Sequence, residues 1–451
     1  MRNILLVGAG RSSSYLIKYF LDHAQEEDWK LTVADVSLSL AQQKTNNHPR
    51  SLAIAFDINN ETQRREEISK ADLVISMLPA HMHLAVAQEC INQKKHLATA
   101  SYVTKEMQSL HVHALKAGIV LLNECGLDPG LDHMSAMKII DRLKSQGAEI
   151  ISFKSYCGGL VAPESNDNPW GYKFSWNPRN VILAGQGTAK FIEDGKYRYL
   201  PYNSLFTETE IIEVADCGTF DGYANRDSLS YRPLYHLEKI PTMLRGTMRQ
   251  SGFCKAWNIF VQLGLTDDSY VIDDSAHLTY AQIVEAFLPA DRENNSLKSR
   301  LAAFMNLKEN SEEIEMVEWT GILEKTPVNM VRATPAQALQ KLLEEKWMLK
   351  PIDKDMIVMQ HRFEIRYDGS GSVMDPDSNR EIKLISNLVV KGEDASYTAM
   401  AKTVGLPLAI TSKLILNGEI KSRGVVVPVT KEIYEPVLKE LATQGIIFKE
   451  N

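Results

Sequence analysis

The first forty residues contain the pattern that most restricts the possible fold. A short apolar run, Ile4 to Val7, ends in the sequence GAGRSS at residues 8–13. From Leu16 to Leu21, apolar residues recur at the spacing of one helix face. A strand, a tight glycine turn and a helix form the first unit of a dinucleotide-binding fold. A plain tight turn after a first strand would carry the same glycines.

Each position of the glycine segment has an expected role. Gly8 makes the turn, and Gly10 lets the backbone approach a pyrophosphate that the free N–H groups at the helix start bind. Ser13 stands where the fingerprint usually has a third glycine, so we expect slightly looser packing of helix on strand.

A second strand, Leu31 to Ala34, ends in Asp35. This fold places there the acid that bonds the ribose hydroxyls of the cofactor. Because a carboxylate repels the 2′-phosphate of NADP, Asp35 favours NAD. The alternative is a solvated acid at the end of a strand.

Composition narrows the class of protein further. The 451 residues suggest two or three domains, and the formal charge of −7 argues against nucleic acid as a partner. No run of eighteen apolar residues occurs and Met1 leads directly into a strand, so we expect neither a membrane span nor a signal peptide.

Five scattered cysteines predict reduced thiols in a cytoplasmic protein. The pairs His81/His83 and His111/His113 have no acid or cysteine cluster beside them, so no metal site is expected.

Short apolar runs alternate with helical stretches up to residue 122. The predicted strands are 4–7, 31–34, 52–56, 73–78, 96–100 and 119–122, which indicates a parallel, doubly wound sheet. Ligands bind at the carboxyl ends of such strands. That rule places one group of residues around a single crevice: Asp57, Ile58, Leu78, Pro79, Ala100, Ser101 and Tyr102.

The chain then turns sharply at GLDPGLDHM, residues 126–134, before a helix that runs to Leu143. Asp128 before Pro129 fits a helix N-cap followed by a proline at the first helical position. It also fits a turn lying over the crevice, with Asp128 near the nicotinamide and a substrate amine. The two interpretations are compatible.

From about residue 150 the pattern changes. A strand over 150–156 leads into a flexible loop, CGGLVAPES at 157–165, and then into NPWGYKFSWNP at 168–178, whose aromatics are more typical of core or lid packing. Strands over 211–214 and 218–223 precede a helix-forming and loop-containing region from about 243 to 342.

The remaining chain predicts a different kind of sheet. Strict alternation over 359–367 and a second strand over 382–390, joined by DGSGSVMDPDS, predict an antiparallel hairpin in which His361 is a packed strand residue. The chain closes with a helix over 396–404, stopped by Gly405, and another over 407–416.

Several stretches together resemble the saccharopine reductases, the glutamate-forming saccharopine dehydrogenases. They are GLDPGLDHMSAM, CGGLVAPES with NPWGYKFSW, ANRDSLSY at 224–231, RGTMR at 245–249 and AMAKTVGLP at 399–407, and the resemblance covers nearly the whole chain. The family implies an α/β fold in three domains. These are a Rossmann NAD(P)-binding domain at 1–125 plus 393–451, a mixed α/β catalytic domain at 126–242 plus 346–392, and an inserted helical domain at 243–345. It also leads us to expect a homodimer.

The resemblance also assigns residue roles. The cofactor is expected to contact Gly8, Gly10, Arg11, Ser12, Ser13, Asp35, Val36, Ser37, Asp57, Ile58, Leu78, Ala100, Ser101, Leu127, Asp128, Pro129 and Ser175. The substrate is expected to meet Ser101, Tyr102, Asp128, Arg226, and a turn formed by Thr247, Met248 and Arg249. The candidates for acid or base are Asp128, Tyr102 and Cys157.

Plainer interpretations of these residues remain open. Arg226 and Arg249 could be ordinary ion-pair arginines, and Cys157 could be a small loop residue. The family's NADP-using members are associated with an arginine near the end of the second strand. Here Ala34, Asp35 and Val36 occupy that stretch, which supports NAD and puts NADP in doubt.

The expected function is hydride transfer with a nicotinamide cofactor. It interconverts L-saccharopine and L-glutamate plus L-2-aminoadipate 6-semialdehyde in lysine metabolism. Guanidinium groups are expected to bind the three carboxylates of saccharopine. One alternative is an imine reductase like carboxynorspermidine synthase, whose substrate has fewer carboxylates. Another is a non-catalytic dinucleotide-binding protein.

Overall fold

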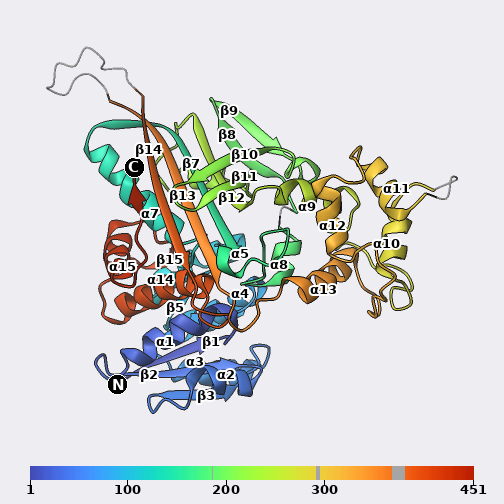
Figure 1. The fold of residues 1–451 in the computed structure, drawn as a ribbon. Helices are drawn as coiled ribbons and strands as arrows, with labels where there is room; N and C mark the ends of the chain where they lie inside the picture. The colour runs from blue at the N-terminus through green and yellow to red at the C-terminus, as the bar shows by residue number, and fades with distance from the viewer. Residues whose placement is uncertain (185, 291–294, 368–380) are drawn as a thin grey trace. The chain divides into compact units, whose positions relative to one another are not determined.

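The computed structural model describes residues 1–184, 186–290, 295–367 and 381–451 (Figure 1). The chain divides into two compact units, Met1–Ile150 with Ile365–Asn451, and Ile151–Glu364. It passes from the first unit to the second within one long strand and returns within another. The predicted connection DGSGSVMDPDS lies outside the described residues. The finer division into three domains remains a prediction.

A seven-stranded sheet forms the centre of the first unit, in the order β15-β6-β5-β4-β1-β2-β3 with every pair parallel. Its strands are β1 (Arg2–Val7), β2 (Trp29–Asp35), β3 (Ser51–Ala55), β4 (Leu73–Ser76), β5 (His96–Thr99), β6 (Val120–Leu122) and β15 (Gly424–Val426). The six predicted strands and the doubly wound α/β class are confirmed. The seventh strand, β15, comes from the C-terminal segment and was not predicted.

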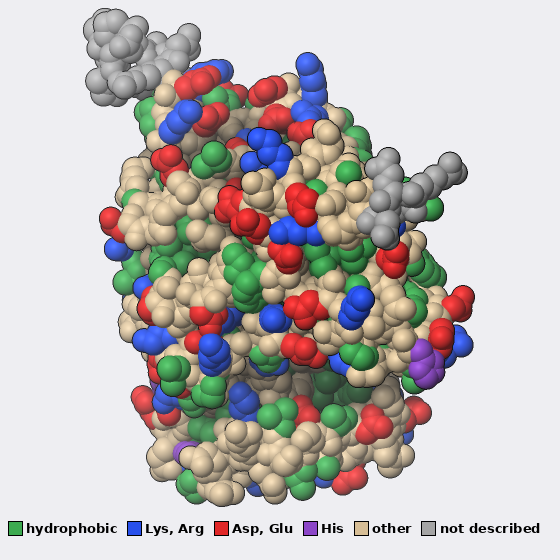
Figure 2. Space-filling model, turned by 45° about the vertical axis from the view of Figure 1, so that its right-hand side comes forward, with side chains coloured by type: hydrophobic (Ala, Val, Ile, Leu, Met, Phe, Trp, Pro, Cys, Tyr) green, Lys and Arg blue, Asp and Glu red, His purple; other side chains and the backbone are tan. Residues whose placement is uncertain are grey.

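Helices surround this sheet. They are α1 (Ser14–Asp22), α2 (Leu38–Thr45), α3 (Glu61–Ser69), α4 (His83–Asn92), α5 (Lys105–Ser109), α6 (His111–Ala117), α7 (Leu131–Ser145), α14 (Ala399–Leu416) and α15 (Lys431–Thr443). The strand β14 (Ile382–Lys391) pairs antiparallel with the short strand β16 (Lys449–Glu450). Figure 2 shows acidic and basic side chains intermixed over the face that it presents.

The predicted break at Gly405 is wrong, because α14 continues through both Gly405 and Pro407. A Cβ on Gly405 would lie 2.9 Å from the backbone nitrogen of Leu16, so the glycine serves the close packing of α14 on α1. By length and composition alone α14 could cross a membrane, but 78% of it is buried. A buried core helix passes the same test, so this is weak evidence for a span.

The second unit contains the strands β7 (Ala148–Val161), β10 (Thr209–Val214), β11 (Gly218–Ala224), β12 (Thr242–Gln250) and β13 (Asp355–Tyr367), in the order β10-β11-β12-β7-β13. A hairpin of β8 (Ala189–Glu193) and β9 (Lys196–Leu200) pairs with β12. The helices are α8 (Pro178–Ile182), α9 (Phe253–Gln262), α10 (Tyr280–Phe287), α11 (Leu297–Phe304), α12 (Glu312–Trp319) and α13 (Pro335–Trp347).

Two predictions for this unit are wrong. Residues 157–161 were assigned to a flexible loop but continue β7, and residues 243–250 were assigned to a helix-forming region but belong to β12. A Cβ on Gly158 would lie 2.8 Å from the carbonyl oxygen of Met248, so this glycine allows two strands to approach closely. The same residue type that favours a loop therefore favours strand pairing here.

The predicted core role of the aromatic segment is confirmed. Trp170 is fully buried and stacks on Phe260 with ring centroids 5.6 Å apart, and Trp347 meets it edge-on at 5.3 Å. The strands predicted at 359–367 and 382–390 are present as β13 and β14, and they are neighbours in a sheet. His361 is fully buried with Nδ1 3.0 Å from Ser155 Oγ, as expected of a packed strand residue.

Candidate active site

The glycine segment between β1 and α1 has the geometry of a phosphate-binding turn. Gly8 has φ +101°, and a Cβ there would lie 2.9 Å from the carbonyl oxygen of Met77, so the position requires glycine. At Gly10 the position of a Cβ is open, with no atom within 4 Å. Ser13 is buried, and its hydroxyl donates to the Gly10 carbonyl at 2.8 Å, which holds the loop at the helix start.

Asp35 joins two segments of this region. Its Oδ2 accepts from the backbone N–H of Ala9 at 2.8 Å, and its Oδ1 accepts from that of Ser37 at 2.9 Å. Ser37 in turn caps α2, and the side chain of Val36 between them is 78% exposed. Both carboxylate oxygens therefore have backbone partners, so Asp35 does not depend on a ribose hydroxyl to be satisfied.

The next predicted cofactor positions follow the carboxyl ends of β3 and β4. The Asp57 carboxylate accepts from the backbone N–H of Asn59 at 2.9 Å and shapes the turn before α3. Ile58 is buried, and Leu78 is partly buried. Asp57, Ile58 and Leu78 therefore lie near the carboxyl ends of parallel strands, as the predicted doubly wound topology requires.

Tyr102 and Asp128 meet in the first unit. The Tyr102 hydroxyl donates to Asp128 Oδ1 at 3.2 Å, and both side chains are partly buried. Tyr102 follows β5, together with Ala100 and Ser101. A phenol and a carboxylate in contact can pass or hold a proton, which is the chemistry predicted for this pair.

The N-cap interpretation of Asp128 is wrong. The GLDPG turn closes on itself, because Gly126 N–H donates to the Pro129 carbonyl at 2.9 Å, and α7 begins only at Leu131 with Gly130 as its N-cap. It is Asp132 that accepts the N–H of Gly130, at 2.6 Å. Asp128 is therefore not used as a cap, and its carboxylate meets Tyr102 instead.

A buried network under this pair was missed at the sequence level. Glu124 follows β6 with φ +57° and is 4% exposed; its Oε1 accepts the N–H of Val103 at 2.9 Å, and its Oε2 lies 2.9 Å from His133 Nε2. His133 Nδ1 lies 3.5 Å from Asp132 Oδ2. The network fixes the loops that carry Tyr102 and Asp128. In the sequence, this network is indicated only by its three polar residues, Glu124, Asp132 and His133, in and beside the motif GLDPGLDHM.

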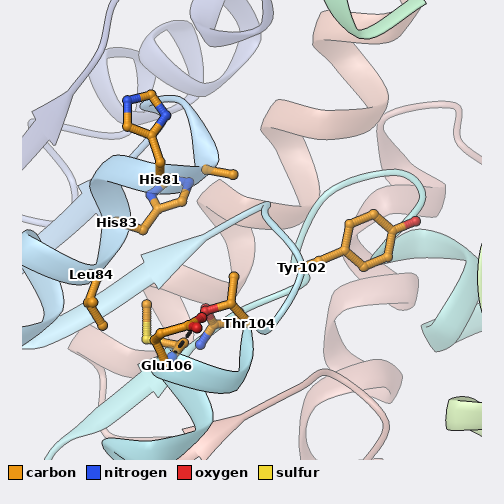
Figure 3. A pocket seen from close by; sticks show the side chains of 9 residues that line it. His81, His83, Leu84, Tyr102, Thr104 and Glu106 are labelled. Carbon is orange, nitrogen blue, oxygen red and sulfur yellow. Dashed lines mark hydrogen bonds between the residues drawn. The ribbon is translucent and has the colours of Figure 1, made fainter. Parts of the chain in front are cut away.

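A cavity of about 240 Å³ lies beside the carboxyl ends of β4, β5 and β6. Figure 3 shows His83 and Leu84 of α4 together with Thr104 and Glu106, with Tyr102 set apart from them. Asn123 also lines it. The side chain of Asn123 is 1% exposed, and its Oδ1 accepts no hydrogen bond from any residue that the structure describes.

In the second unit, the charged guanidinium of Arg249 lies among aromatic rings. It is 4% exposed, and its guanidinium lies 5.2 Å from the Tyr172 ring centroid and 5.6 Å from that of Phe253. Nη1 donates to the Met248 carbonyl at 3.0 Å, and Nε has no hydrogen-bond partner among the residues that the structure describes. Within the described ranges no carboxylate pairs with it, so the ion-pair interpretation of Arg249 is wrong. A buried charge without a counter-ion is costly, and an anionic ligand would remove that cost.

Some of the other residues predicted for the site in this unit lie near Arg249 in the sheet. Thr247 and Met248 precede it in β12, so the predicted turn is a strand, and Cys157 in β7 lies opposite Thr247. Cys157 is 8% exposed, which excludes its interpretation as a residue of a flexible loop. Ser175 is also buried, at 3% exposure.

Arg226 lies elsewhere in the same unit. It is exposed, with φ +49°, and it follows β11, whose last residue Ala224 pairs with Gly246. Gly246 precedes Arg249 by three residues, or about 10 Å of strand. The two arginines are therefore well separated along the sheet.

No group of three or more His, Cys, Asp or Glu within the described ranges is arranged to hold a metal ion. The five cysteines are all free thiols.

Comparison with known proteins gives matches along the whole chain. Residues 126–446 match the family model described as the saccharopine dehydrogenase C-terminal domain, and residues 4–122 match the saccharopine dehydrogenase NADP binding domain. The mitochondrial alpha-aminoadipic semialdehyde synthase of Mus musculus is 36% identical over 99% of this chain and 47% of its own length. The chain therefore spans about half the length of that relative.

A yeast sequence and a solved yeast structure match the chain from end to end. Saccharopine dehydrogenase [NADP(+), L-glutamate-forming] of Saccharomyces cerevisiae is 34% identical over 100% of this chain and 99% of its own. A solved structure, apo saccharopine dehydrogenase (L-Glu forming) from the same organism, has a TM-score of 0.86 and 31% identity, and it covers 100% of this chain and 99% of that one. The family resemblance and the fold are confirmed. The preference for NAD finds no support in these names.

Proposed function

Because the chain belongs to the saccharopine dehydrogenase family, we propose that it interconverts L-saccharopine and L-glutamate plus L-2-aminoadipate 6-semialdehyde by hydride transfer with a nicotinamide dinucleotide, as a step of lysine metabolism. The observation that carries this proposal is Arg249, a buried guanidinium among aromatic rings without a carboxylate partner within the described ranges. Saccharopine has three carboxylates that such a group can bind.

The glycine segment fits a dinucleotide. Gly10 leaves its Cβ position open at the start of α1, and Gly8 makes the turn that only glycine allows. Pyrophosphate would bind the N–H groups of this loop. A bound nicotinamide would supply the acceptor for a hydride from the carbon next to the secondary nitrogen of saccharopine, and the hydride donor in the reverse direction.

The protein's own groups handle charge and protons. Arg249 holds a carboxylate of the amino-acid substrate. Asp128 takes the proton of the secondary amine, and the Tyr102 hydroxyl, which donates to Asp128 at 3.2 Å, stabilises the carboxylate before that transfer. Hydrolysis of the resulting imine releases glutamate and the semialdehyde.

Turnover of two substrates tests the proposal. We expect saccharopine to reduce the nicotinamide cofactor with a kcat/KM at least about 100-fold above that of carboxynorspermidine, because the latter has fewer carboxylates to bind. The formation of reduced nicotinamide, followed by absorbance, measures both. Turnover of carboxynorspermidine without turnover of saccharopine would reject the proposal, and turnover of neither would favour a non-catalytic dinucleotide-binding protein.

For the cofactor we propose NADP(+), which the names of the fungal relatives and of the matching domain support. We expect kcat/KM with NADP(+) to exceed that with NAD by about tenfold or more, a difference of about 1.4 kcal/mol. Steady-state kinetics with saccharopine at saturation checks this. Asp35→Ala removes the carboxylate near the expected ribose site and should leave NADP(+) preferred. A wild-type preference for NAD that Asp35→Ala abolishes would restore the interpretation of Asp35 as the residue that selects NAD.

A further inference from the structure

Three hydrogen-bonded side chains, two of them buried, form a line across the carboxyl ends of β4 and β5. Ser76 is the last residue of β4, His83 is the first residue of α4, and Ser101 follows β5. Ser76 Oγ lies 2.8 Å from His83 Nδ1, and His83 Nε2 lies 2.7 Å from Ser101 Oγ. Ser76 and His83 are 0% and 3% exposed, whereas Ser101 is partly exposed.

The hydrogen bond with Ser76 determines which ring nitrogen of His83 is protonated. Among the described residues, His83 Nδ1 is the only hydrogen-bond partner of the Ser76 hydroxyl. If Nδ1 carried the proton, the buried hydroxyl hydrogen of Ser76 would have no acceptor, and a buried donor without an acceptor destabilises the fold. The Ser76 hydroxyl therefore donates to Nδ1.

The protonation of His83 also determines which atom donates in the hydrogen bond between His83 and Ser101. Burial, with the nearby His81, lowers the pKa of His83 to about 4, so the ring is neutral near pH 7 and has one N–H. With Nδ1 as acceptor, that N–H is at Nε2 and donates to Ser101 Oγ. The hydroxyl hydrogen of Ser101 has no acceptor within the described residues, and it is left for a ligand.

We propose that Ser76 and His83 are positioning residues that hold Ser101 as a hydrogen-bond donor to an oxygen of the bound ligand, either a carboxylate oxygen of the amino-acid substrate or an acceptor oxygen of the dinucleotide. This inference rests on the proposed function for the identity of the ligand. The direction of the hydrogen bonds does not rest on it.

The tautomer of His83 can be measured in the ligand-free protein. Long-range ¹H–¹⁵N spectra of protein labelled with ¹⁵N-histidine distinguish a protonated from an unprotonated ring nitrogen, and the signals missing in His83→Gln identify this residue. We expect Nε2–H with Nδ1 unprotonated. The opposite tautomer would overturn the proposal whether or not the protein turns over saccharopine, so the failure of this inference is distinguishable from the failure of the proposed function.

Ligand binding gives a second measurement. Ser101→Ala should raise either the KM for saccharopine or the Kd for NADP(+) by about 10- to 100-fold, as expected for a lost hydrogen bond to a charged acceptor. Ser76→Ala should raise the same constant by about three- to tenfold although Ser76 is fully buried. The double variant should lose no more than Ser101→Ala alone, because Ser76 acts only through Ser101.

The constant that changes tells which oxygen Ser101 binds. A change in the saccharopine KM alone identifies a substrate carboxylate, and a change in the NADP(+) Kd alone identifies the dinucleotide. Ser386→Ala removes another fully buried hydroxyl, one without a hydrogen-bond partner within the described ranges, and should change neither constant. Unchanged binding in Ser76→Ala, or a double variant whose losses add, would overturn the proposal.

Discussion

Replacing Arg249 by methionine is expected to lower kcat/KM for saccharopine by about 100- to 1,000-fold and to leave the dinucleotide Kd unchanged. The magnitude is that of losing a buried, hydrogen-bonded charge pair with a ligand. Arg249 is 4% exposed and lies over two aromatic rings, so water cannot replace it as the partner of a carboxylate. Steady-state kinetics and dinucleotide titration of the same preparation give both numbers.

Thermal unfolding separates this binding role from a structural one. Since Arg249 has no carboxylate partner within the described ranges, methionine removes an uncompensated buried charge, and we expect Tm to stay the same or rise. Arg198→Met is the matched control, because Arg198 also lies over an aromatic ring, Phe191, but pairs with Glu193 and is exposed. It should leave kcat/KM unchanged. A fall in Tm with normal saccharopine kinetics in Arg249→Met would show that Arg249 is structural.

The N-terminal half of the fold was predictable because its signals are local. Each strand of the first sheet up to β6 is a short apolar run followed by a turn residue and a helical period, and Gly8 adopts the positive φ expected of the turn. The strand β15 could not be predicted in this way. It is three residues long and is defined only by its pairing with β6.

Two of the errors concern glycines, because one residue type serves two purposes. The sequence predicts a helix stop at Gly405 and a loop at Gly158, yet each lies where a Cβ would meet a neighbouring backbone, at Leu16 and at Met248. A close approach between segments far apart in the sequence leaves no local pattern. The sequence alone therefore cannot distinguish such a glycine from one that ends an element.

At the candidate site, too, contacts between segments far apart in the sequence could not be predicted. The motif GLDPG drew attention to Asp128, and its contact with Tyr102 agrees with a proton-transfer role. The carboxylate of Glu124 and the ring of His133 lie 2.9 Å apart and almost fully buried beneath it. Their burial depends on how the segments after β5 and β6 pack against the start of α7, which periodicity and motif spacing do not report.

Replacing Asp128 by asparagine is expected to lower kcat by about 100- to 1,000-fold while changing the KM for saccharopine and the dinucleotide Kd by less than about threefold. General acid–base catalysis contributes effects of this size, and asparagine keeps the shape of the side chain without its basicity. Tyr102→Phe removes the donor to Asp128 Oδ1 but leaves the carboxylate, so its kcat should fall by only about tenfold. Initial rates under cofactor and substrate saturation measure both variants.

A second tyrosine–aspartate pair in the first unit provides the control. Tyr434 of α15 donates to Asp141 Oδ2 of α7 at 2.6 Å, so Asp141→Asn perturbs a similar pair at another place in the fold and should keep the wild-type kcat. The pH profile adds a readout that a structural role would not change. The wild-type profile of kcat should show an acidic limb from Asp128, and that limb should disappear in Asp128→Asn. An unchanged kcat, or an acidic limb that persists in the asparagine variant, would assign the proton transfer to a different group, with Tyr102 and Cys157 the remaining candidates.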